Sequence, residues 1–278
     1  MAEVVLEAQA VSKIYPLRGG ALRRQRGSVA AVNGVSCFLR RGEALGLVGE
    51  SGSGKTTLAK LLIGLIQPTE GDVLIDGESF SGLRGQRLRE IRRRVQFVFQ
   101  DPLNSLNPRL TVEETVAEPL IIHRLSVTRK ERAARVEELL ASVQLPASYR
   151  RRVPRELSGG ERQRVGIARA LATAPDALIC DEPIASLDVS VGAHVLELLR
   201  RINRERTTAL LFISHDLRAV ASLCERIAVM REGQLIETAP TERLLNHPTS
   251  PYTELLIRCA ELDLEAGLPT DDRSEAVS

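Results

Sequence analysis

The residues with the clearest chemistry lie at positions 49–56, where the sequence reads GESGSGKT. This G-x-x-x-x-G-K-T spacing follows the apolar run ALGLV and opens the helical pattern KTTLAKLLIGLI, which is the context that a phosphate-binding loop requires. Glycines at these positions let the loop curl so that its backbone amides face phosphate oxygens. Lys55 is then placed to reach the β- and γ-phosphates, and Thr56 to bind Mg²⁺. The segment predicts a nucleoside-triphosphate site.

We expect the whole loop and the residue after it to bind the nucleotide, with Thr57 at the α-phosphate. The residues concerned are Gly49, Glu50, Ser51, Gly52, Ser53, Gly54, Lys55, Thr56 and Thr57. The alternative is a chance glycine-rich turn, which the succession of strand, loop and helix patterns disfavours.

Two acidic residues, Asp181 and Glu182, follow a second apolar run, ALIC. An unpaired carboxylate at the end of a buried strand is costly, so Asp181 needs a cation, and Mg²⁺ held jointly with Thr56 supplies one. Glu182 is suited to orient and deprotonate an attacking water, a role worth about 10²–10⁴-fold in rate. The alternative for Glu182 is a surface carboxylate. The pair predicts a metal ligand beside a catalytic base.

Gln100 and His215 also come directly after or close to apolar runs, VQFVF and LLFI. Gln100 is suited to contact both Mg²⁺ and water, and the alternative is a cap at the end of a strand. His215 is suited to hydrogen-bond the γ-phosphate, although a single histidine at a strand end is more often structural. Both become catalytic candidates because they accompany the other clusters.

The segment LSGGERQR begins another helical pattern at positions 157–164. Ser158 and Glu161 have the spacing of a capping box, which satisfies free amides at a helix start. Gly159 and Gly160 also leave the backbone bare, so an anion can approach those amides. The two interpretations are compatible.

The elements that must position these residues are the apolar runs at 44–48, 95–99, 177–180 and 210–213. Continuous apolar strands separated by helical stretches predict an α/β fold whose parallel sheet is covered on both faces. Ligands of such sheets bind beyond the carboxyl ends of the strands. The polar clusters are therefore expected to meet at one ligand.

Composition narrows the class of protein. At 278 residues the chain is long for one simple domain, so we expect one domain with a subdomain. It has no apolar run near the ~20 residues of a membrane helix, and MAEVVLEAQAV has no features of a secretion signal. The four cysteines are scattered, which is typical of reduced cytosolic thiols.

The net charge of +2 hides three arginine clusters, at 18–26, 92–94 and 150–152. With 3% aromatic residues and no Trp, the chain offers little on which bases can stack, so we expect no nucleic-acid partner. A solvated face, or a face near anionic lipid head groups, is the alternative for these arginines.

In the order phosphate loop, Gln100, LSGGE, ICDEP, ASLD and SHD, these motifs resemble the ATP-binding subunit of an ABC transporter over nearly the whole chain. The resemblance implies a P-loop NTPase core with a parallel sheet flanked by helices, antiparallel N-terminal strands and an inserted helical subdomain. It also implies an ATPase coupled to transport, in which two such subunits face head to tail and close on two ATP molecules. Ser158, Gly159 and Gly160 would then contact the γ-phosphate held by the partner's loop.

The same resemblance implies that Tyr15 stacks on adenine and that Asp188 communicates between the two ATP sites; an ordinary strand tyrosine is the alternative for Tyr15. The nucleotide-binding core is expected at residues 1–99 and 166–235, with the helical subdomain at 100–165. A C-terminal extension is expected at 236–278, and its acidic, polar end is predicted to be disordered.

QDPLNSLNPRLTV and HPTSPYTELL resemble the dipeptide and oligopeptide importer branch, which includes nickel importers. Many ATPases of this branch carry a cysteine cluster after the second segment, but here only Cys259 follows it. The chain is thus more similar to the subunit without the cluster, which pairs with a different ATPase. The interval from Gln100 to Ser158 is too short for the coiled coils of a DNA-repair ATPase, and each motif occurs once, unlike in a translation ATPase with two cassettes.

Residues 107–123 place apolar side chains after Gln100, with a capping box at Thr111 and Glu114. The apolar members are Leu110, Val112, Val116, Leu120, Ile121 and Ile122. They are expected to pack the subdomain and, at exposed positions, to dock a helix of one of two membrane permease subunits. The implied location is the cytoplasmic face of the cell membrane, with a solute-binding protein as an indirect partner.

Overall fold

Two β-sheets organise the part of the chain that the structure describes, residues 3–16, 27–100, 105–126 and 128–266, with side chains described to residue 260. In this computed structural model the larger sheet has the strand order β10-β9-β3-β8-β7-β6. Its strands are β3 (Ala44–Val48), β6 (Val95–Val98), β7 (Ala177–Asp181), β8 (Ala209–Ile213), β9 (Arg226–Arg231) and β10 (Gln234–Pro240). All neighbours pair in parallel except β9 with β10. The four apolar runs are therefore strands of a parallel sheet, as predicted.

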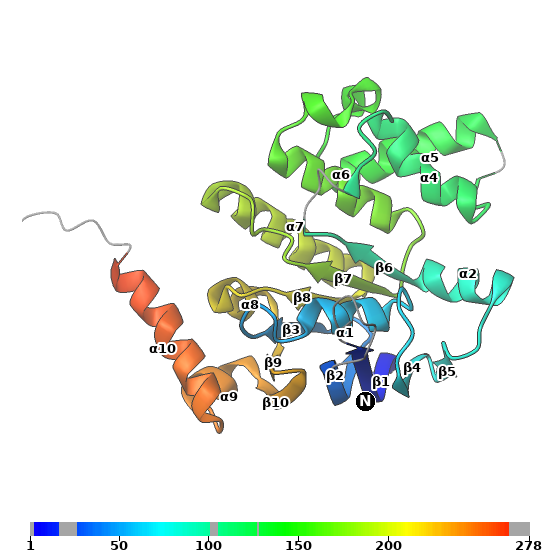
Figure 1. Cartoon of the computed structure of the whole chain (residues 1–278). Helices are drawn as coiled ribbons and strands as arrows, with labels where there is room; N and C mark the ends of the chain where they lie inside the picture. Colours follow the sequence, from blue (N-terminus) through cyan, green and yellow to red (C-terminus); the bar gives the residue numbers. More distant parts are fainter. Residues whose placement is uncertain (1–2, 17–26, 101–104, 127, 267–278) are drawn as a thin grey trace, which may run out of the picture.

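β3 and β8 are apolar throughout, and β7 is apolar up to Asp181, because both faces of the larger sheet are covered (Figure 1). In β7, Leu178 and Cys180 pack into one hydrophobic cluster, whereas Ala177 and Ile179 pack into the other. Alternate side chains of a strand point to opposite faces, so each face needs its own apolar layer.

The smaller sheet is antiparallel and has the order β2-β1-β4-β5. Its strands are β1 (Val4–Pro16), β2 (Ser28–Arg40), β4 (Glu70–Ile75) and β5 (Glu78–Ser79). Val5, Val32 and Ile75 of this sheet share a hydrophobic cluster with Leu58 of the helix α1 (Lys55–Leu62). The expected antiparallel N-terminal strands are thus confirmed.

Helices cover the sheets, and α4, α5 and α10 lie farther from them (Figure 1). Besides α1 they are α2 (Gly85–Arg94), α4 (Val112–Ile122), α5 (Arg129–Ser142), α6 (Gly159–Leu171), α7 (Val189–Arg206), α8 (Leu217–Leu223), α9 (Thr241–Asn246) and α10 (Pro251–Ala266), with 3₁₀ turns at Ala147–Arg151 and Pro154–Glu156. Within the described ranges, no helix has the length and apolar character that crossing a bilayer requires.

α4, α5 and α6 pack against one another and form the helical region between β6 and β7. The capping box predicted at Thr111 and Glu114 is present at the start of α4. α6 is continuous across residue 165, where a subdomain boundary was expected. The expected disordered end of the C-terminal extension lies outside the described residues.

One helix is shorter than predicted. α1 ends at Leu62, whereas its apolar pattern continues to Ile66. Gly64 has a φ of +64°, a left-handed conformation that terminates a right-handed helix, so the apolar residues beyond it leave the helix.

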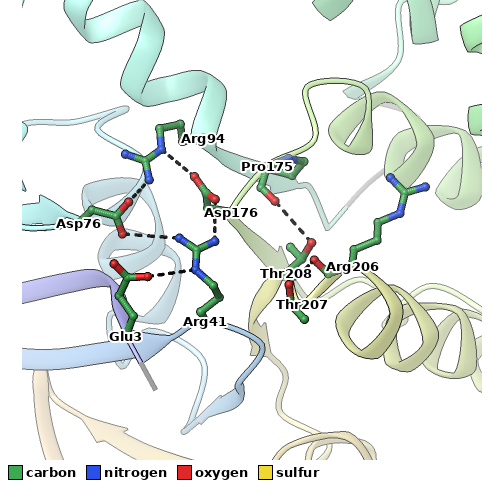
Figure 2. A network of polar contacts seen from close by, with 9 residues as sticks. All are labelled: Glu3, Arg41, Asp76, Arg94, Pro175, Asp176, Arg206, Thr207 and Thr208. Atoms are coloured by element: carbon green, nitrogen blue, oxygen red, sulfur yellow. Dashed lines mark hydrogen bonds and ion pairs between the residues drawn. The ribbon is translucent and has the colours of Figure 1, made fainter. Parts of the chain in front are cut away.

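Ion pairs link the two sheets near the amino end of β7 (Figure 2). Arg41, after β2, lies 2.9 Å from Asp176, which precedes β7, and 3.4 Å from Glu3. Arg94, at the end of α2, contacts Asp176 at 2.6 Å and also pairs with Asp76 after β4. This arginine of the 92–94 cluster therefore stabilises the fold internally.

Two arginines of the 150–152 cluster, Arg150 and Arg152, also make contacts within the fold. Arg150 pairs with Glu113 at 3.0 Å and with Glu137, and the Arg152 guanidinium lies 3.8 Å from the centroid of the Tyr149 ring. These contacts connect α4, α5 and the turn before α6. The arginines at 18–26 lie outside the described residues.

Candidate functional site

All four polar clusters contribute to one open cavity of about 330 Å³. The lining residues are Ala31, Ser51, Gly52, Gly54, Lys55, Thr56, Thr57, Gln100, Asp181, Glu182 and His215. Apart from Ala31 of β2, they lie at or after the ends of β3, β6, β7 and β8, whose carboxyl ends share one edge of the parallel sheet. The arrangement is the one in which α/β sheets bind ligands.

The phosphate loop is shaped by its glycines and by Lys55. Gly54 precedes α1 with a φ of +106°, and a Cβ at that position would lie 2.2 Å from the carbonyl oxygen of Ala31. The Nζ atom of Lys55 donates hydrogen bonds to the carbonyl oxygens of Gly49 at 2.7 Å and Glu50 at 2.8 Å. The loop is therefore wrapped around an ammonium group.

Lys55 is buried, and its charge is balanced by the acidic residues of the cavity. Burial lowers its pKa, while the charges of Glu182 and Asp181 oppose that shift. A buried cation next to backbone amides at a helix start creates a positive potential, which favours an anion such as phosphate.

Asp181 has the chemistry of a cation ligand. Its side chain is 3% exposed, it accepts a hydrogen bond from Thr56, and its Oδ1 atom has no hydrogen-bond partner among the residues that the structure describes. Burial raises the pKa of Asp181, and the neighbouring Glu182 raises it further. Buried polar atoms normally have partners, so the unpartnered Oδ1 beside a threonine hydroxyl and the Gln100 amide fits a Mg²⁺ ion, which prefers oxygen ligands.

Glu182 and His215 contact each other across the cavity. The Nδ1 atom of His215 lies 3.0 Å from Oε1 and 2.9 Å from Oε2 of Glu182. Glu182 has a φ of +49°, and its N–H donates to the carbonyl oxygen of Ile213 at 2.9 Å. A left-handed non-glycine residue is unfavourable and persists where its surroundings fix it, which is common at functional sites. Neither the contact with His215 nor the left-handed backbone of Glu182 could be predicted from the sequence.

Several predicted site residues do not line this cavity. Gly49, Glu50 and Ser53 belong to the phosphate loop but do not contribute to the cavity lining, and of the three only Glu50 is exposed. Tyr15 lies on β1 with 42% of its surface exposed, and the Lys13 ammonium is 5.5 Å from its ring centroid. Among the residues that the structure describes, its aromatic ring is therefore partly accessible to a ligand.

The LSGGE residues and Asp188 also lie outside the cavity lining. Ser158 caps α6: its hydroxyl accepts from the Glu161 N–H at 3.3 Å, and the Glu161 carboxylate accepts from the Ser158 N–H at 2.7 Å. The predicted capping box is therefore confirmed. Asp188 is exposed at the start of α7 and makes no cap with its side chain.

Gly160 has a packing role that the sequence did not reveal. A Cβ at this position would lie 2.2 Å from Cγ1 of Val191 on α7. A larger residue would force either the Val191 side chain or the start of α6 to move, so this buried glycine allows the close packing of α6 on α7. A close approach between helices leaves no periodic signal in a sequence.

A second cavity, of about 700 Å³, adjoins the first and shares Thr56, Gln100 and Asp181 with it. Its outer wall includes Phe99, after β6, and Ile122, at the end of α4. Both side chains are exposed, at 40% and 50% respectively. An apolar surface thus lies directly beside the residues that fit a metal ion.

Comparison with known proteins gives the family. Residues 32–185 match the family model described as ABC transporter. The oligopeptide transport ATP-binding protein AppF of Bacillus subtilis (strain 168) is 44% identical over 266 residues, which cover 95% of this chain and 80% of that protein. OppF of the same organism is 48% identical over 238 residues, covering 85% and 78%.

Among solved structures, the ATP-binding cassette MJ0796, described as a dimer in a post-hydrolysis state bound to ADP and Pi, has a TM-score of 0.75 and 33% identity. The match covers 85% of this chain and 98% of that one. Motif order, fold, cavity and relatives agree, and the chain belongs to the ABC transporter family.

Proposed function

We propose that this chain is the ATP-hydrolysing subunit of an ABC importer that takes up small peptides, acting at the cytoplasmic face of the cell membrane. The observation that carries the ATPase assignment is the shared cavity of the phosphate loop, Asp181, Glu182 and His215. The names of the relatives, oligopeptide and peptide transport ATP-binding proteins, support peptides as the solute. They favour this solute over nickel and over a role in translation or DNA repair.

ATP would bind with its phosphates against the loop amides and the Lys55 ammonium. The loop glycines give the backbone the close approach that phosphate oxygens require. Thr57 lines the same cavity and would contact the α-phosphate, while the exposed ring of Tyr15 would stack on adenine.

Thr56, Gln100 and Asp181 would hold Mg²⁺, whose charge offsets the negative charge that develops during phosphoryl transfer. Only one of these three donors is an acid, and Mg²⁺ sites of this kind are completed by water and substrate phosphates. The unpartnered Oδ1 of Asp181 supports the assignment.

Glu182 would orient the attacking water and accept its proton. The His215 ring holds the carboxylate of Glu182 from the side of β8, which limits the positions that the base can occupy. On nucleotide binding, His215 would turn to the γ-phosphate, and Gln100 would contact the water.

The second half of the site would come from another ATPase subunit, arranged head to tail. Ser158, Gly159 and Gly160 do not line the cavity of their own chain, although they form the start of α6, where Ser158 and Gly159 are exposed and the first backbone amides have no partner within the helix. Those amides would contact the γ-phosphate of the partner's ATP, and the exposed Asp188 would lie between the two sites. We infer that the partner is a different chain.

The permease would dock at the larger cavity, since its apolar wall at Phe99 and Ile122 adjoins Gln100 and Asp181. Movement of Gln100 on nucleotide binding would shift this wall, and with it a permease helix. Two permease subunits and, through them, a solute-binding protein complete the proposed importer.

Two substitutions in the purified subunit test the ATPase assignment. Lys55→Ala is expected to lose ATP binding, because it removes the buried cation of the loop. Glu182→Gln is expected to bind ATP while hydrolysis falls by about 10²-fold or more, because it removes the base and keeps the shape. Binding is measured with a fluorescent ATP analogue, and turnover as phosphate release.

Glu254→Gln on α10 serves as the control, since this exposed carboxylate pairs only with Arg258 in the structure described and is expected to leave both quantities unchanged. Near-normal turnover of Glu182→Gln would remove Glu182 from the role of base.

A further inference from the structure

The phosphate loop is joined to the C-terminal helix by a hydrogen bond across 202 positions of the sequence. The N–H of Glu50 donates to the hydroxyl of Tyr252, in the first turn of α10, at 3.1 Å. The Tyr252 side chain is 6% exposed, and the Arg231 guanidinium lies 4.8 Å from its ring centroid. The ring is therefore held firmly, and its hydroxyl reaches the loop at a fixed place.

The segment before Tyr252 is anchored on β10 by one carboxylate. Glu237 accepts hydrogen bonds at 2.8 Å from both the N–H and the hydroxyl of Thr249, and at 3.1 Å from the N–H of Ser250. Although burial alone would raise the pKa of Glu237, the hydrogen bonds from Thr249 and Ser250 lower it. Strong acceptance by an ionised carboxylate fixes the approach of the chain to α10.

Both polar groups of the Glu50 backbone make hydrogen bonds. Its N–H meets Tyr252, while its carbonyl oxygen accepts from the Lys55 ammonium at 2.8 Å. Glu50 itself does not line the nucleotide cavity, so these contacts fix the backbone of the loop and not a side chain that would touch the phosphates.

We propose that Tyr252 is a positioning residue of the nucleotide site, whose hydroxyl fixes the amide of Glu50 and so presets the phosphate loop for ATP. The proposal rests on the proposed ATPase function. A loop that is already ordered loses less conformational freedom when the ligand binds, so preorganisation appears as affinity. α10 lies beside α9 and β10, away from α4 and α5, and acts from the opposite side of the molecule (Figure 1).

Tyr252→Phe removes the hydroxyl and keeps the ring with its packing against Arg231. We expect the Kd and KM for ATP to rise by about three- to tenfold, the loss of one hydrogen bond, with kcat unchanged. The effect is bounded because Glu50 is exposed and its amide can bond to water instead. Kd is measured by titration with a non-hydrolysable ATP analogue, and KM and kcat by phosphate release.

Leu255→Ala, at a position of the same helix that is 54% exposed, is the control and should leave all three constants unchanged. Glu237→Gln weakens the anchor without touching the loop and should raise KM in the same direction. The Tyr252→Phe effect should persist in a Glu50→Ala background, because the backbone N–H remains there.

An unchanged Kd and KM in Tyr252→Phe, or a fall in kcat at unchanged KM, would overturn the proposal. So would the disappearance of the effect in the Glu50→Ala background. Failure of the wild-type protein to bind ATP would instead overturn the proposed function, and the two results are distinguishable in one titration series.

Discussion

Asp181 is a residue of the nucleotide site that lowers the stability of the folded protein. It is buried at the end of β7, and no described residue bonds to its Oδ1 atom. Burial raises its pKa above the value in an unfolded chain. A carboxyl group with a raised pKa in the folded state contributes stability at low pH that is lost as the pH rises through that pKa. Near neutral pH, charged Asp181 therefore destabilises the folded protein.

We predict that Asp181→Asn stabilises the subunit and inactivates it. The free energy of unfolding at neutral pH, measured with urea in the absence of nucleotide and Mg²⁺, is expected to rise by about 0.5–2 kcal/mol. The gain should shrink as the pH falls, because protonated Asp181 carries no charge in the wild type either. ATP hydrolysis is expected to fall by about 10²-fold or more, since an amide is a poorer Mg²⁺ ligand. A variant less stable than the wild type would contradict this account of Asp181.

For the residues of the site, the sequence predicted which ones lie close together, but not the side-chain contacts that fix their positions. Polar residues that follow parallel strands must share one edge of a sheet, so the proximity of Gln100, Asp181 and His215 followed from their positions. The contact between His215 and Glu182, and the bond from Glu50 to Tyr252, depend on side-chain directions. Neither leaves a periodic pattern.

The start of α4 could be predicted from the sequence, whereas its exposed residues could not. Thr111 and Glu114 fixed the start of the helix, because a capping box needs both residues at that spacing. The sequence did not show which apolar residues are exposed, since they occupy more than one face of the helix. The structure buries Val116 and Leu120 and leaves Ile122 at the surface.

Ile122, at the exposed end of α4, allows a test of the proposed permease docking. Ile122→Glu places a charge on the apolar wall of the larger cavity and is expected to abolish copurification with the permease and peptide uptake. ATP hydrolysis by the free subunit should remain within about twofold, because a surface substitution rarely alters stability much. Copurification from detergent-solubilised membranes and phosphate release measure the two effects.

Leu255→Glu is the matched control, because Leu255 is 54% exposed against 50% for Ile122 and lies on α10, on the other side of the molecule. It should leave assembly unchanged. If Ile122→Glu still assembled and transported normally, the permease would have to dock elsewhere.

Three residues of the molecule are shared by its two neighbouring cavities. Thr56, Gln100 and Asp181 line both the nucleotide cavity and the cavity beside α4. A change in the ligands of the first would therefore alter the wall of the second, as the proposed coupling between ATP and a permease requires. Ser158 lies outside the cavity of its own chain, which is the placement that the proposed head-to-tail pairing of two subunits requires. From the sequence, that assembly followed from family resemblance alone, because contacts between chains leave no spacing pattern.

The most direct test of the central claim is uptake of a radiolabelled oligopeptide by cells whose own copy of this subunit is replaced by Glu182→Gln. The account predicts that uptake is lost, although the variant is present in the membrane fraction and binds ATP, because hydrolysis by this chain energises import. Peptide uptake at the wild-type rate would contradict it.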